Sequence, residues 1–568
     1  MNRQSFPWER HYPHGLGWEV AVPRETIPAM IAATIARCGP DPALEYRGHR
    51  ISFSQLGAAI DDVAKGLLAL GLLKGERIAL YLPNTPGHPF SFFGALAAGL
   101  VVVHLSPLDA ERELIRRLRD SGARTLVCTN IGNLLATAQK LLNAGHVDRL
   151  IVGDDAQFGP VAGMPHPAIP SDDRRIITIP ALRAMGRGTA ATLPPIDPDD
   201  LALLQYTGGT TGCPKGAMHS HATLRASVAI YAAFLDGQQR FGPGEKLRAI
   251  CALPLCHIYA LVVLLLLHLS RGSELLLRPK FDPETTLRDI EVNRASYFPG
   301  VPTMWISLAN VPDLDKRDLS SLRLAGSGGA PLPIEIGQRF ARLTGMRLGG
   351  GWGMTETASA GTGNLVDGIF KPGSAGLPLP GIELEVVALD DATRVLPYGE
   401  IGEIRIKSPN LFKGYWNHPD DYRRAFVNGF FLTGDIGRID GDGMVFLIDR
   451  KTDMILSGGY NVYPTRIEQA IYEHPDVAEA VVVGIPDAYR GQSAKAFITL
   501  KAGAAAFGID ALRVFLADKL GRPEMPVAVE FRSALPKTPV GKFSRKELAA
   551  EAAAPPYPES LSGTDKSA

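Results

Sequence analysis

The stretch that decides the fold is Tyr206-Thr207-Gly208-Gly209-Thr210-Thr211-Gly212-Cys213-Pro214-Lys215-Gly216. Its glycines let the backbone turn so that successive N–H groups point into one concavity. The threonine hydroxyls and the lysine add further donors, and this combination suits a polyphosphate. The stretch is not a Walker A loop, because Pro214 precedes Lys215 and no Ser or Thr follows it. A plain turn is the alternative, and the density of donors favours the phosphate loop.

Further motifs appear in order along the chain, and the set covers roughly residues 50 to 550. In chain order they are Pro254-Leu255-Cys256-His257-Ile258-Tyr259, Gly326-Ser327-Gly328-Gly329-Ala330-Pro331-Leu332, Gly351-Trp352-Gly353-Met354-Thr355-Glu356, Gly414-Tyr415-Trp416, Phe431-Leu432-Thr433-Gly434-Asp435, Asp449-Arg450-Lys451, Ser457-Gly458-Gly459-Tyr460-Asn461-Val462-Tyr463-Pro464 and Pro536-Lys537-Thr538-Pro539-Val540-Gly541-Lys542. In kind and in order, the set resembles the adenylate-forming superfamily of acyl-CoA synthetases, coumarate-type ligases, luciferases and peptide-synthetase adenylation domains. One such motif alone would be weak, whereas the ordered series is specific.

The resemblance implies an AMP-forming acyl-CoA synthetase. Such an enzyme uses ATP to convert a carboxylic acid to an acyl-adenylate and then transfers the acyl group to coenzyme A. The products are acyl-CoA, AMP and pyrophosphate. Two anions must approach each other in the first step, so the site needs cations and fixed donors at the developing charge.

The resemblance also assigns nucleotide and metal roles, residue by residue. The expected phosphate-binding residues are Thr207, Gly208, Gly209, Thr210, Thr211, Gly212 and Lys215, with Thr355 at the α-phosphate. The expected adenosine contacts are Gly328, Gly329, Ala330, Pro331, Trp352, Gly353, Asp435 and Arg450. Mg²⁺, a hard cation that prefers oxygen ligands, is assigned to Glu356 and Thr210. Lys542 is expected to bridge the carboxylate and the α-phosphate.

Each of these residues has a plainer interpretation when taken singly. Glu356 could begin a surface helix, Trp352 could be a core aromatic and Asp435 could serve a turn. Arg450 and Lys542 could be solvated charges. The motif context favours the functional interpretation for all five.

The thiol step is assigned to a glycine pair near the C-terminus. Gly458, Gly459 and Tyr460 resemble the strand that lines the pantetheine channel, and a turn glycine pair is the alternative. The family's C-terminal domain swings between two poses about a hinge. Thr452 stands at the hinge position, where Asp or Lys is usual, so the preference between poses is in question.

The expected acyl pocket is mostly apolar. Its residues are His257, Ile258, Tyr259, Val301, Pro302, Thr303, Met304, Trp305 and Ser327, and Gly350 is expected to leave room and remove a polar contact beside it. His257 is equally well explained as a core histidine. Arg294 and Arg323 are the cations whose position decides whether a distal carboxylate is accepted. A hydrophobic acid of medium or long chain is the natural fit.

Other functions remain open. The chain could be a dicarboxylate- or aryl-acid–CoA ligase, an acyl-AMP ligase that loads a carrier protein, or an inactive nucleotide-binding scaffold. The Asp440-Gly441-Asp442-Gly443 tetrad is expected to be a hairpin turn, because it lacks the spacing of a calcium loop.

Composition bounds the class of protein. The chain has 568 residues, with 59 basic and 59 acidic side chains, 45% hydrophobic residues and 5 cysteines. These values predict a globular protein that does not bind nucleic acid, in a reducing compartment, and we expect it in the cytoplasm. The longest apolar run, residues 258–267, is too short for a membrane span and predicts a buried helix. A homodimer remains open.

The predicted fold class is α/β, with a large N-terminal body of layered α/β subdomains plus a β-subdomain and a small mobile α+β C-terminal domain. Residues 1–449 form the predicted body, with the acyl, ATP and metal sites. Residues 450–551 form the mobile domain and 552–568 a disordered tail.

Overall fold

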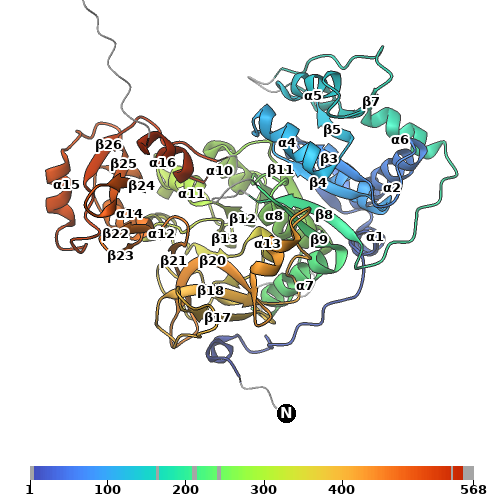
Figure 1. Cartoon of the computed structure of the whole chain (residues 1–568). Helices are drawn as coiled ribbons and strands as arrows, with labels where there is room; N and C mark the ends of the chain where they lie inside the picture. Colours follow the sequence, from blue (N-terminus) through green and yellow to red (C-terminus); the bar gives the residue numbers. More distant parts are fainter. Residues whose placement is uncertain (1–4, 161–164, 208–213, 239–244, 539–541, 554–568) are drawn as a thin grey trace, which may run out of the picture. The chain divides into compact units, whose positions relative to one another are not determined.

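A computed structural model describes residues 5–160, 165–207, 214–238, 245–538 and 542–553 (Figure 1). By their internal contacts these residues form two compact units. The first unit contains the chain to Leu447 together with Lys542, and the second contains 448–538 and the chain from Phe543. The chain passes from one to the other inside a strand, β21 (Val445–Arg450).

The first sheet of the first unit has the strand order β7-β6-β5-β3-β4-β8-β9. Its strands are β3 (Arg77–Tyr81), β4 (Val101–Leu105), β5 (Thr125–Thr129), β6 (Arg149–Gly153), β7 (Ile176–Thr178), β8 (Leu201–Tyr206) and β9 (Gly216–Ser220). All neighbours are parallel except the final hairpin, β8–β9. The parallel strands are nearly continuous apolar runs, as expected for strands buried on both faces.

The second sheet has the order β16-β15-β14-β13-β12-β10-β11-β1-β2. Its strands are β1 (Pro42–Tyr46), β2 (His49–Ser52), β10 (Arg248–Cys251), β11 (Glu274–Leu277), β12 (Tyr297–Gly300), β13 (Leu324–Ser327), β14 (Gly349–Trp352), β15 (Thr362–Gly363) and β16 (Leu377–Pro378). Strands β14, β13, β12, β10, β11 and β1 are parallel, and β1–β2 is an antiparallel hairpin.

The two sheets share one topology. Position by position, β7-β6-β5-β3-β4-β8-β9 matches β14-β13-β12-β10-β11-β1-β2, including the terminal antiparallel hairpin. In both sheets the strand order reverses beside the first parallel strand, β3 or β10. Such reversals open a crevice at the carboxyl ends of the strands, where ligands bind in open α/β sheets. The sequence contains no repeat at a fixed period from which this duplicated topology could be predicted.

Helices cover both sheets. They are α1 (Ile27–Cys38), α2 (Phe53–Ala69), α3 (Gly87–Ala97), α4 (Glu111–Ser121), α5 (Leu134–Asn143), α6 (Ile179–Arg187), α7 (His221–Gly237), α8 (Ile258–Ala260), α9 (Leu267–Ser270), α10 (Pro283–Glu291), α11 (Pro302–Ala309) and α12 (Ile334–Thr344). Helices α2 and α6 lie side by side (Figure 1), and a Cβ on Gly186 would lie only 1.9 Å from the Asp62 carbonyl oxygen. A continuous apolar core extends from α1–α3 to strands of both sheets and to α11 and α12.

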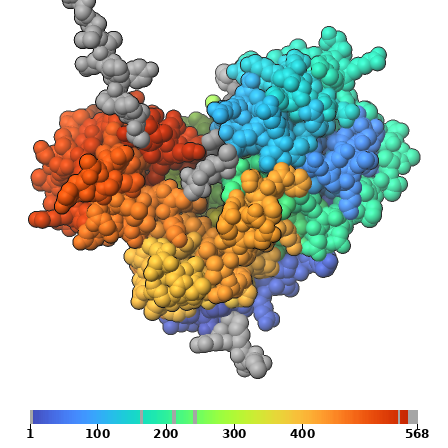
Figure 2. Space-filling model, in the orientation of Figure 1, coloured from blue at the N-terminus to red at the C-terminus, as the bar shows by residue number. Residues whose placement is uncertain are grey.

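A third, smaller sheet completes the first unit. Its strands are β17 (Glu383–Val387), β18 (Gly402–Lys407), β19 (Phe426–Val427), β20 (Phe430–Ile439) and β21, and α13 (Pro419–Arg424) lies beside β19. The segment before α13 reaches the first sheet's helices, because Trp416 Nε1 donates to the carbonyl of Asp120 over 3.0 Å. In Figure 2 this orange segment meets the blue surface of that region.

The second unit is a small α+β fold. Its sheet contains β22 (Ile455–Ser457), β23 (Tyr460–Val462), β24 (Val477–Asp487), β25 (Gly491–Leu500) and β26 (Ala528–Phe531). Helices α14 (Pro464–Tyr472), α15 (Ile509–Leu516) and α16 (Arg545–Ala553) accompany it. Helix α16 includes the first two residues of the predicted tail, 552 and 553, and 554–568 lie outside the described residues.

These elements confirm the predicted α/β fold class. The apolar run at 258–267 is a buried helix as predicted, but its central part, Leu261–Leu266, is π-helical. None of the described helices is long and apolar enough to cross a bilayer. Residues 440–443 form the predicted turn, in which Lys371 Nζ pairs with Asp440 and lies 2.7 Å from Asp442 Oδ2.

Candidate active site

The Gly353–Glu356 motif lies in a crowded, strained turn. A Cβ on Gly353 would lie 1.7 Å from the Ser359 carbonyl oxygen, so only glycine fits there. Ala358 and Ser359 have φ of 44° and 78°, which are unfavourable for residues with a side chain. Strain of this kind persists only where surrounding contacts over-determine the backbone, and it concentrates at functional sites.

Side chains from distant segments supply those contacts. His219 Nε2 hydrogen-bonds the Thr355 carbonyl at 2.8 Å, and Ser227 Oγ donates to the Ala358 carbonyl at 2.7 Å. Further donors are Tyr231 to the Ser359 carbonyl at 2.8 Å, and Asn410 Nδ2 to the carbonyls of Thr357 and Ala360. Sequence reasoning missed these four residues, because none belongs to a recognised motif.

A polar relay joins Glu356 to the phosphate loop. Glu356 is 7% exposed, and its Oε1 accepts a hydrogen bond of 2.8 Å from the Tyr415 hydroxyl. Lys215 Nζ lies 5.3 Å from the centre of the Tyr415 ring and 2.5 Å from Asp421 Oδ2. The Lys215 ammonium holds the pKa of the Asp421 carboxyl below its usual value. The predicted metal carboxylate and the predicted phosphate lysine therefore lie on either side of one tyrosine.

The side chains of Trp352 and Asp435 are hydrogen-bonded to each other. Trp352 Nε1 donates to Asp435 Oδ2 over 2.8 Å, and both side chains are buried. One edge of the indole packs on Gly361, where a Cβ would lie 2.6 Å from the ring. The predicted base-stacking and ribose-binding residues are thus brought together, although their roles toward nucleotide stay predictions.

The glycine-rich turn after β13 is shaped by two aromatic side chains. A Cβ on Gly328 would lie 2.9 Å from the Tyr259 ring, and Gly329 has a φ of 82°. Trp305, fully buried, donates from Nε1 to the Gly326 carbonyl at 3.0 Å, so it supports this turn from behind. Gly329, Ala330 and Pro331 are exposed, and their contact with the adenine base stays a prediction.

Two polar atoms at the predicted acyl pocket are buried without a protein partner in the described part of the chain. They are His257 Nε2 and Ser327 Oγ. Burial lowers the pKa of His257 to about 3, so the ring is neutral near pH 7. Unpaired buried polar atoms are rare in folded proteins, and each of these two can form a hydrogen bond with a ligand that enters the pocket.

The remaining acyl-side residues form an apolar group after β10 and β12. Ile258, Val301 and Met304 are buried, and Tyr259 and Thr303 are half-buried. Arg294 and Arg323 lie at the opposite, amino-terminal ends of β12 and β13, where they pair with Asp318 and Glu245.

Gly350 differs from expectation in one respect. A Cβ there would lie 3.1 Å from Asn364 Nδ2, which itself donates to the Gly350 and Ser374 carbonyls. The space beside Gly350 is therefore filled by a side-chain amide instead of being vacant. Asn364 comes from the loop after β15, so a pattern around residue 350 could not reveal it.

The second unit holds the other predicted residues. Gly458 and Gly459 connect β22 to β23 with φ of 58° and 84°, the geometry of a tight hairpin turn. Among the described residues, no atom beyond their chain neighbours lies within 4 Å of a Cβ built on either glycine, and Tyr460 is 63% exposed. Arg450 ends β21 beside Asp449, whose carboxylate accepts from the Thr465 amide at 2.9 Å.

Several predicted residues lie outside the described chain or at its edge. Gly208, Gly209, Thr210, Thr211 and Gly212 are not among the described residues, whereas Thr207 and Lys215 close the hairpin, Thr207 N donating to the Lys215 carbonyl at 3.0 Å. Lys542 is described and half-buried, and its contacts group it with the first unit.

The donor set fits ATP with Mg²⁺. Within the described ranges no cluster of three or more His, Cys, Asp or Glu side chains forms a ready-made metal cage. Mg²⁺ is typically bound by one or two carboxylates together with substrate phosphates, and Glu356 offers such a carboxylate. When bound there, the ion would neutralise charge on the phosphates.

Buried histidines make stability depend on pH. Burial lowers the pKa of His104, His219, His221 and His268 to about 4, and that of His88 below its ordinary value of 6.5. Below pH 6.5 the unfolded chain binds more protons at these histidines than the folded chain does. Their neutral burial therefore does not reduce the free energy of unfolding above that pH, and this free energy decreases as the pH drops below it. Each such group costs about 1.4 kcal/mol per pH unit there.

We therefore expect the thermal unfolding temperature to decrease as the pH is lowered from 7 to 5. His88 lacks a hydrogen-bond partner among the described residues, so His88→Phe is expected to flatten this dependence. The matched variant His14→Gln, at an exposed position, should leave it unchanged. An equal slope in His88→Phe and the parent would contradict the assignment.

Comparisons with known proteins agree with this geometry. Residues 31–416 match the model of the AMP-binding enzyme family, and 466–542 match its C-terminal domain. A long-chain-fatty-acid–CoA ligase of Bacillus subtilis (strain 168) is 36% identical over 555 residues, covering 96% of this chain and 98% of its own. A feruloyl-CoA synthase of an Amycolatopsis species is 34% identical, covering 90% and 96%.

A solved structure is also similar. The ATP-bound RpMatB-BxBclM chimera B1 superposes with a TM-score of 0.82 at 30% identity, covering 93% of this chain and 99% of that one. Family models and relatives thus span nearly the whole chain. The chain belongs to the AMP-binding enzyme family, within the adenylate-forming superfamily, and is an AMP-forming acid–CoA ligase.

Proposed function

We propose that this ligase activates a hydrophobic carboxylic acid of medium or long chain. The observation that carries the proposal is the apolar group Ile258, Val301 and Met304 at the carboxyl ends of β10 and β12. Arg294 and Arg323 are paired at the opposite strand ends, so neither is available for a distal carboxylate. The Bacillus subtilis relative, a long-chain-fatty-acid–CoA ligase, agrees with this choice.

The proposed reaction has two steps. A carboxylate oxygen attacks the α-phosphorus of ATP, and pyrophosphate leaves. The coenzyme A thiol, having lost its proton, then attacks the acyl carbonyl, and AMP leaves. In the first step Lys542 offsets the charge between the reacting anions, while Lys215 and Glu356 act at the phosphates, Glu356 as the Mg²⁺ ligand. Neutral His257 and Ser327 Oγ are available to orient the acyl carboxylate by hydrogen bonds.

An aryl acid is the second candidate. The feruloyl-CoA synthase relative, 34% identical, favours it. Asn364 Oδ1, which is buried without a hydrogen-bond partner among the described residues, offers an acceptor for a hydroxyl group on an aryl acid.

Acid profiling tests the proposal. ATP–pyrophosphate exchange is measured with acids of increasing chain length, with dicarboxylates and with hydroxycinnamates. We expect exchange to rise with chain length and to be weak for acids with a distal charge. A hydroxycinnamate preference would replace the fatty-acid proposal, and absence of exchange with every acid would reject adenylation. AMP release without thioester formation on adding coenzyme A would indicate a carrier-protein acceptor.

The glycine pair gives a test of the thiol step. Gly459→Leu is expected to lower coenzyme A-dependent turnover about tenfold or more relative to Gly459→Ala, with pyrophosphate exchange unchanged in both. Both variants carry the same strain at a φ of 84°, so their difference reports side-chain bulk in the proposed pantetheine channel. Equal turnover in the two variants would reject the channel assignment.

A further inference from the structure

The first sheet has a crevice equivalent to the one that carries the candidate active site. In the second sheet, the predicted acyl and nucleotide residues follow the carboxyl ends of β10, β12 and β13. In the first sheet, the equivalent strands are β3, β5 and β6. A cavity of about 550 Å³ lies at their carboxyl ends. Nothing in the proposed reaction uses it.

The cavity is built in the same way as the active site. Its floor comes from the segments after β3, β5 and β6, namely Leu82, Thr85, Thr129 and Gly153. One wall is β2, the second strand of the terminal hairpin of the other sheet. The matching hairpin β8–β9 of the first sheet contacts the crevice of the second sheet. There Gln205 Nε2, on β8, donates to the carbonyl of Cys256, in the segment that follows β10, over 2.8 Å. Each sheet thus lends its hairpin to the crevice of the other.

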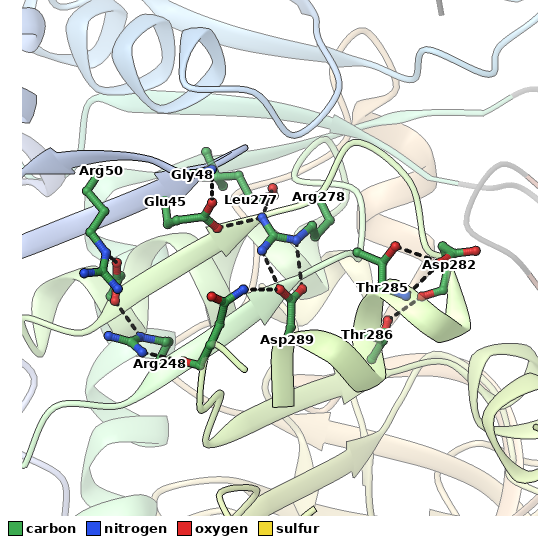
Figure 3. A network of polar contacts seen from close by, with 12 residues as sticks. Glu45, Gly48, Arg50, Arg248, Leu277, Arg278, Asp282, Thr285, Thr286 and Asp289 are labelled. Carbon is green, nitrogen blue, oxygen red and sulfur yellow. Dashed lines mark hydrogen bonds and ion pairs between the residues drawn. The ribbon is translucent and has the colours of Figure 1, made fainter. Parts of the chain in front are cut away.

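The hairpin wall is held in place by ion pairs (Figure 3). Arg278 Nη1 lies 2.8 Å from Glu45 Oε2 on β1 and binds Asp289 through two nitrogens. Arg50, which lines the cavity, has its Nε 3.2 Å from Glu274 Oε1, and Arg248 binds the other oxygen of Glu274. The cavity wall is therefore anchored, as a preformed binding site requires.

Two of the arginines that line the cavity come from one helix, α6. Arg183 and Arg187, one turn apart on α6, both line it and both bind the same oxygen, Asp62 Oδ2, at 3.1 and 2.7 Å. One carboxylate cannot neutralise two guanidinium groups. The Arg187 guanidinium uses only Nη1 in this pair, so its remaining donors are available to an anion.

The acidic residues of the cavity are already engaged. Asp155 accepts from Tyr46 at 2.9 Å, and its Oδ2 lies 2.6 Å from Arg47 Nη2 and 3.0 Å from His166 Nε2. Asp154 Oδ1 accepts from Asn130 Nδ2 at 2.9 Å and from the Ala156 amide. The other walls are largely apolar, with Ile51, Leu82, Phe90, Phe158 and Ile179.

We propose that this cavity is a second binding site, for an acyl chain with an anionic headgroup. The headgroup pairs with Arg187 and Arg183, and the chain lies against the apolar walls. The free acid carries its negative charge on the carboxylate at the end of the chain, and its coenzyme A thioester carries it on phosphates beyond the pantetheine arm. The inference extends the proposed function, because a site for the enzyme's own class of substrate or product would let that molecule act on the enzyme outside the active site.

Equilibrium binding tests the proposal without turnover. The active site is first saturated with lauroyl-sulfamoyladenosine, an acyl-adenylate analogue that cannot react. Laurate, lauryl alcohol and lauroyl-CoA are then titrated calorimetrically. We expect one equivalent of laurate or lauroyl-CoA to bind, and the neutral alcohol to bind at least about tenfold more weakly, since a charge-assisted hydrogen bond is lost.

Two variants locate the bound molecule. Arg187→Gln leaves Arg183 on Asp62 and is expected to weaken binding about tenfold. Ala58→Trp places a large side chain in the cavity from an exposed position on α2 and should abolish binding. The matched controls Arg112→Gln and Ala184→Trp, both at exposed helix positions that do not line the cavity, should bind normally.

The outcomes separate this inference from the proposed function. Binding of laurate alone assigns the site to the free acid, and binding of lauroyl-CoA alone assigns it to the product. Binding unaffected by Ala58→Trp, or no binding beyond the active site, overturns the inference while acid activation, measured separately by pyrophosphate exchange, stands. If the parent protein shows no ATP–pyrophosphate exchange with any acid but still binds laurate in the cavity, the proposed function is overturned and this inference stands.

Discussion

Lys542→Ala is expected to reduce ATP–pyrophosphate exchange by about a hundredfold to a thousandfold. The ammonium group is the proposed bridge between two anions that must meet in the first step, and removal of one such electrostatic contact typically costs this much. The measurement is the exchange rate at saturating acid and ATP. Lys546→Ala is the control, because Lys546 is an exposed lysine four residues away on α16.

The second step distinguishes catalysis from damage. With synthetic acyl-adenylate supplied, Lys542→Ala should form acyl-CoA at close to the parent rate, because the α-phosphate bond is already made. Equal losses in both steps would show that the variant disturbs folding or domain motion, and the assigned role of Lys542 would be wrong.

Glu356→Gln is expected to lower exchange about a hundredfold or more. The substitution keeps the size of the side chain and removes the charge that the proposed Mg²⁺ site needs. The rate is measured as Mg²⁺ is titrated, and the variant should require a higher Mg²⁺ concentration for half-maximal exchange. Removing Mg²⁺ with a chelator should abolish exchange in the parent.

Tyr415→Phe is the matched variant for Glu356. It removes the 2.8 Å hydrogen bond to Glu356 Oε1 and leaves the carboxylate charge in place. We expect a loss of about tenfold in apparent Mg²⁺ affinity, the scale of an outer contact to a metal ligand. An unchanged Mg²⁺ dependence in Glu356→Gln would remove Glu356 from the metal site.

Many of the candidate site residues could be predicted from the sequence, because they lie in short contiguous motifs. Gly353 is required by its approach to the Ser359 carbonyl, and Ser359 is only six residues away. The turn at Gly458 and Gly459 likewise needs two consecutive positive φ angles. Local constraints of this kind leave a local pattern, and a pattern is what sequence reasoning reads.

The residues that sequence reasoning missed act over long separations. Ser227 bonds Ala358 across 131 positions, and His219 bonds Thr355 across 136. Neither the position of Ser227 nor that of His219 in the sequence indicates which carbonyl its side chain will contact. Asn364 beside Gly350 was missed for the same reason, since the amide comes from another loop.

The sequence by itself determined the α/β class, the family and the chemistry of adenylation, because those depend on backbone conformations and donor types confined to short segments. Only the tertiary structure decided that the sheet topology occurs twice, that Tyr415 joins Lys215 to Glu356, and that Arg183 and Arg187 meet one carboxylate beside a cavity. These features arise where strand ends and helices far apart in the chain pack together. Packing of that kind minimises exposed apolar surface over the whole fold, so it leaves no pattern in any single stretch.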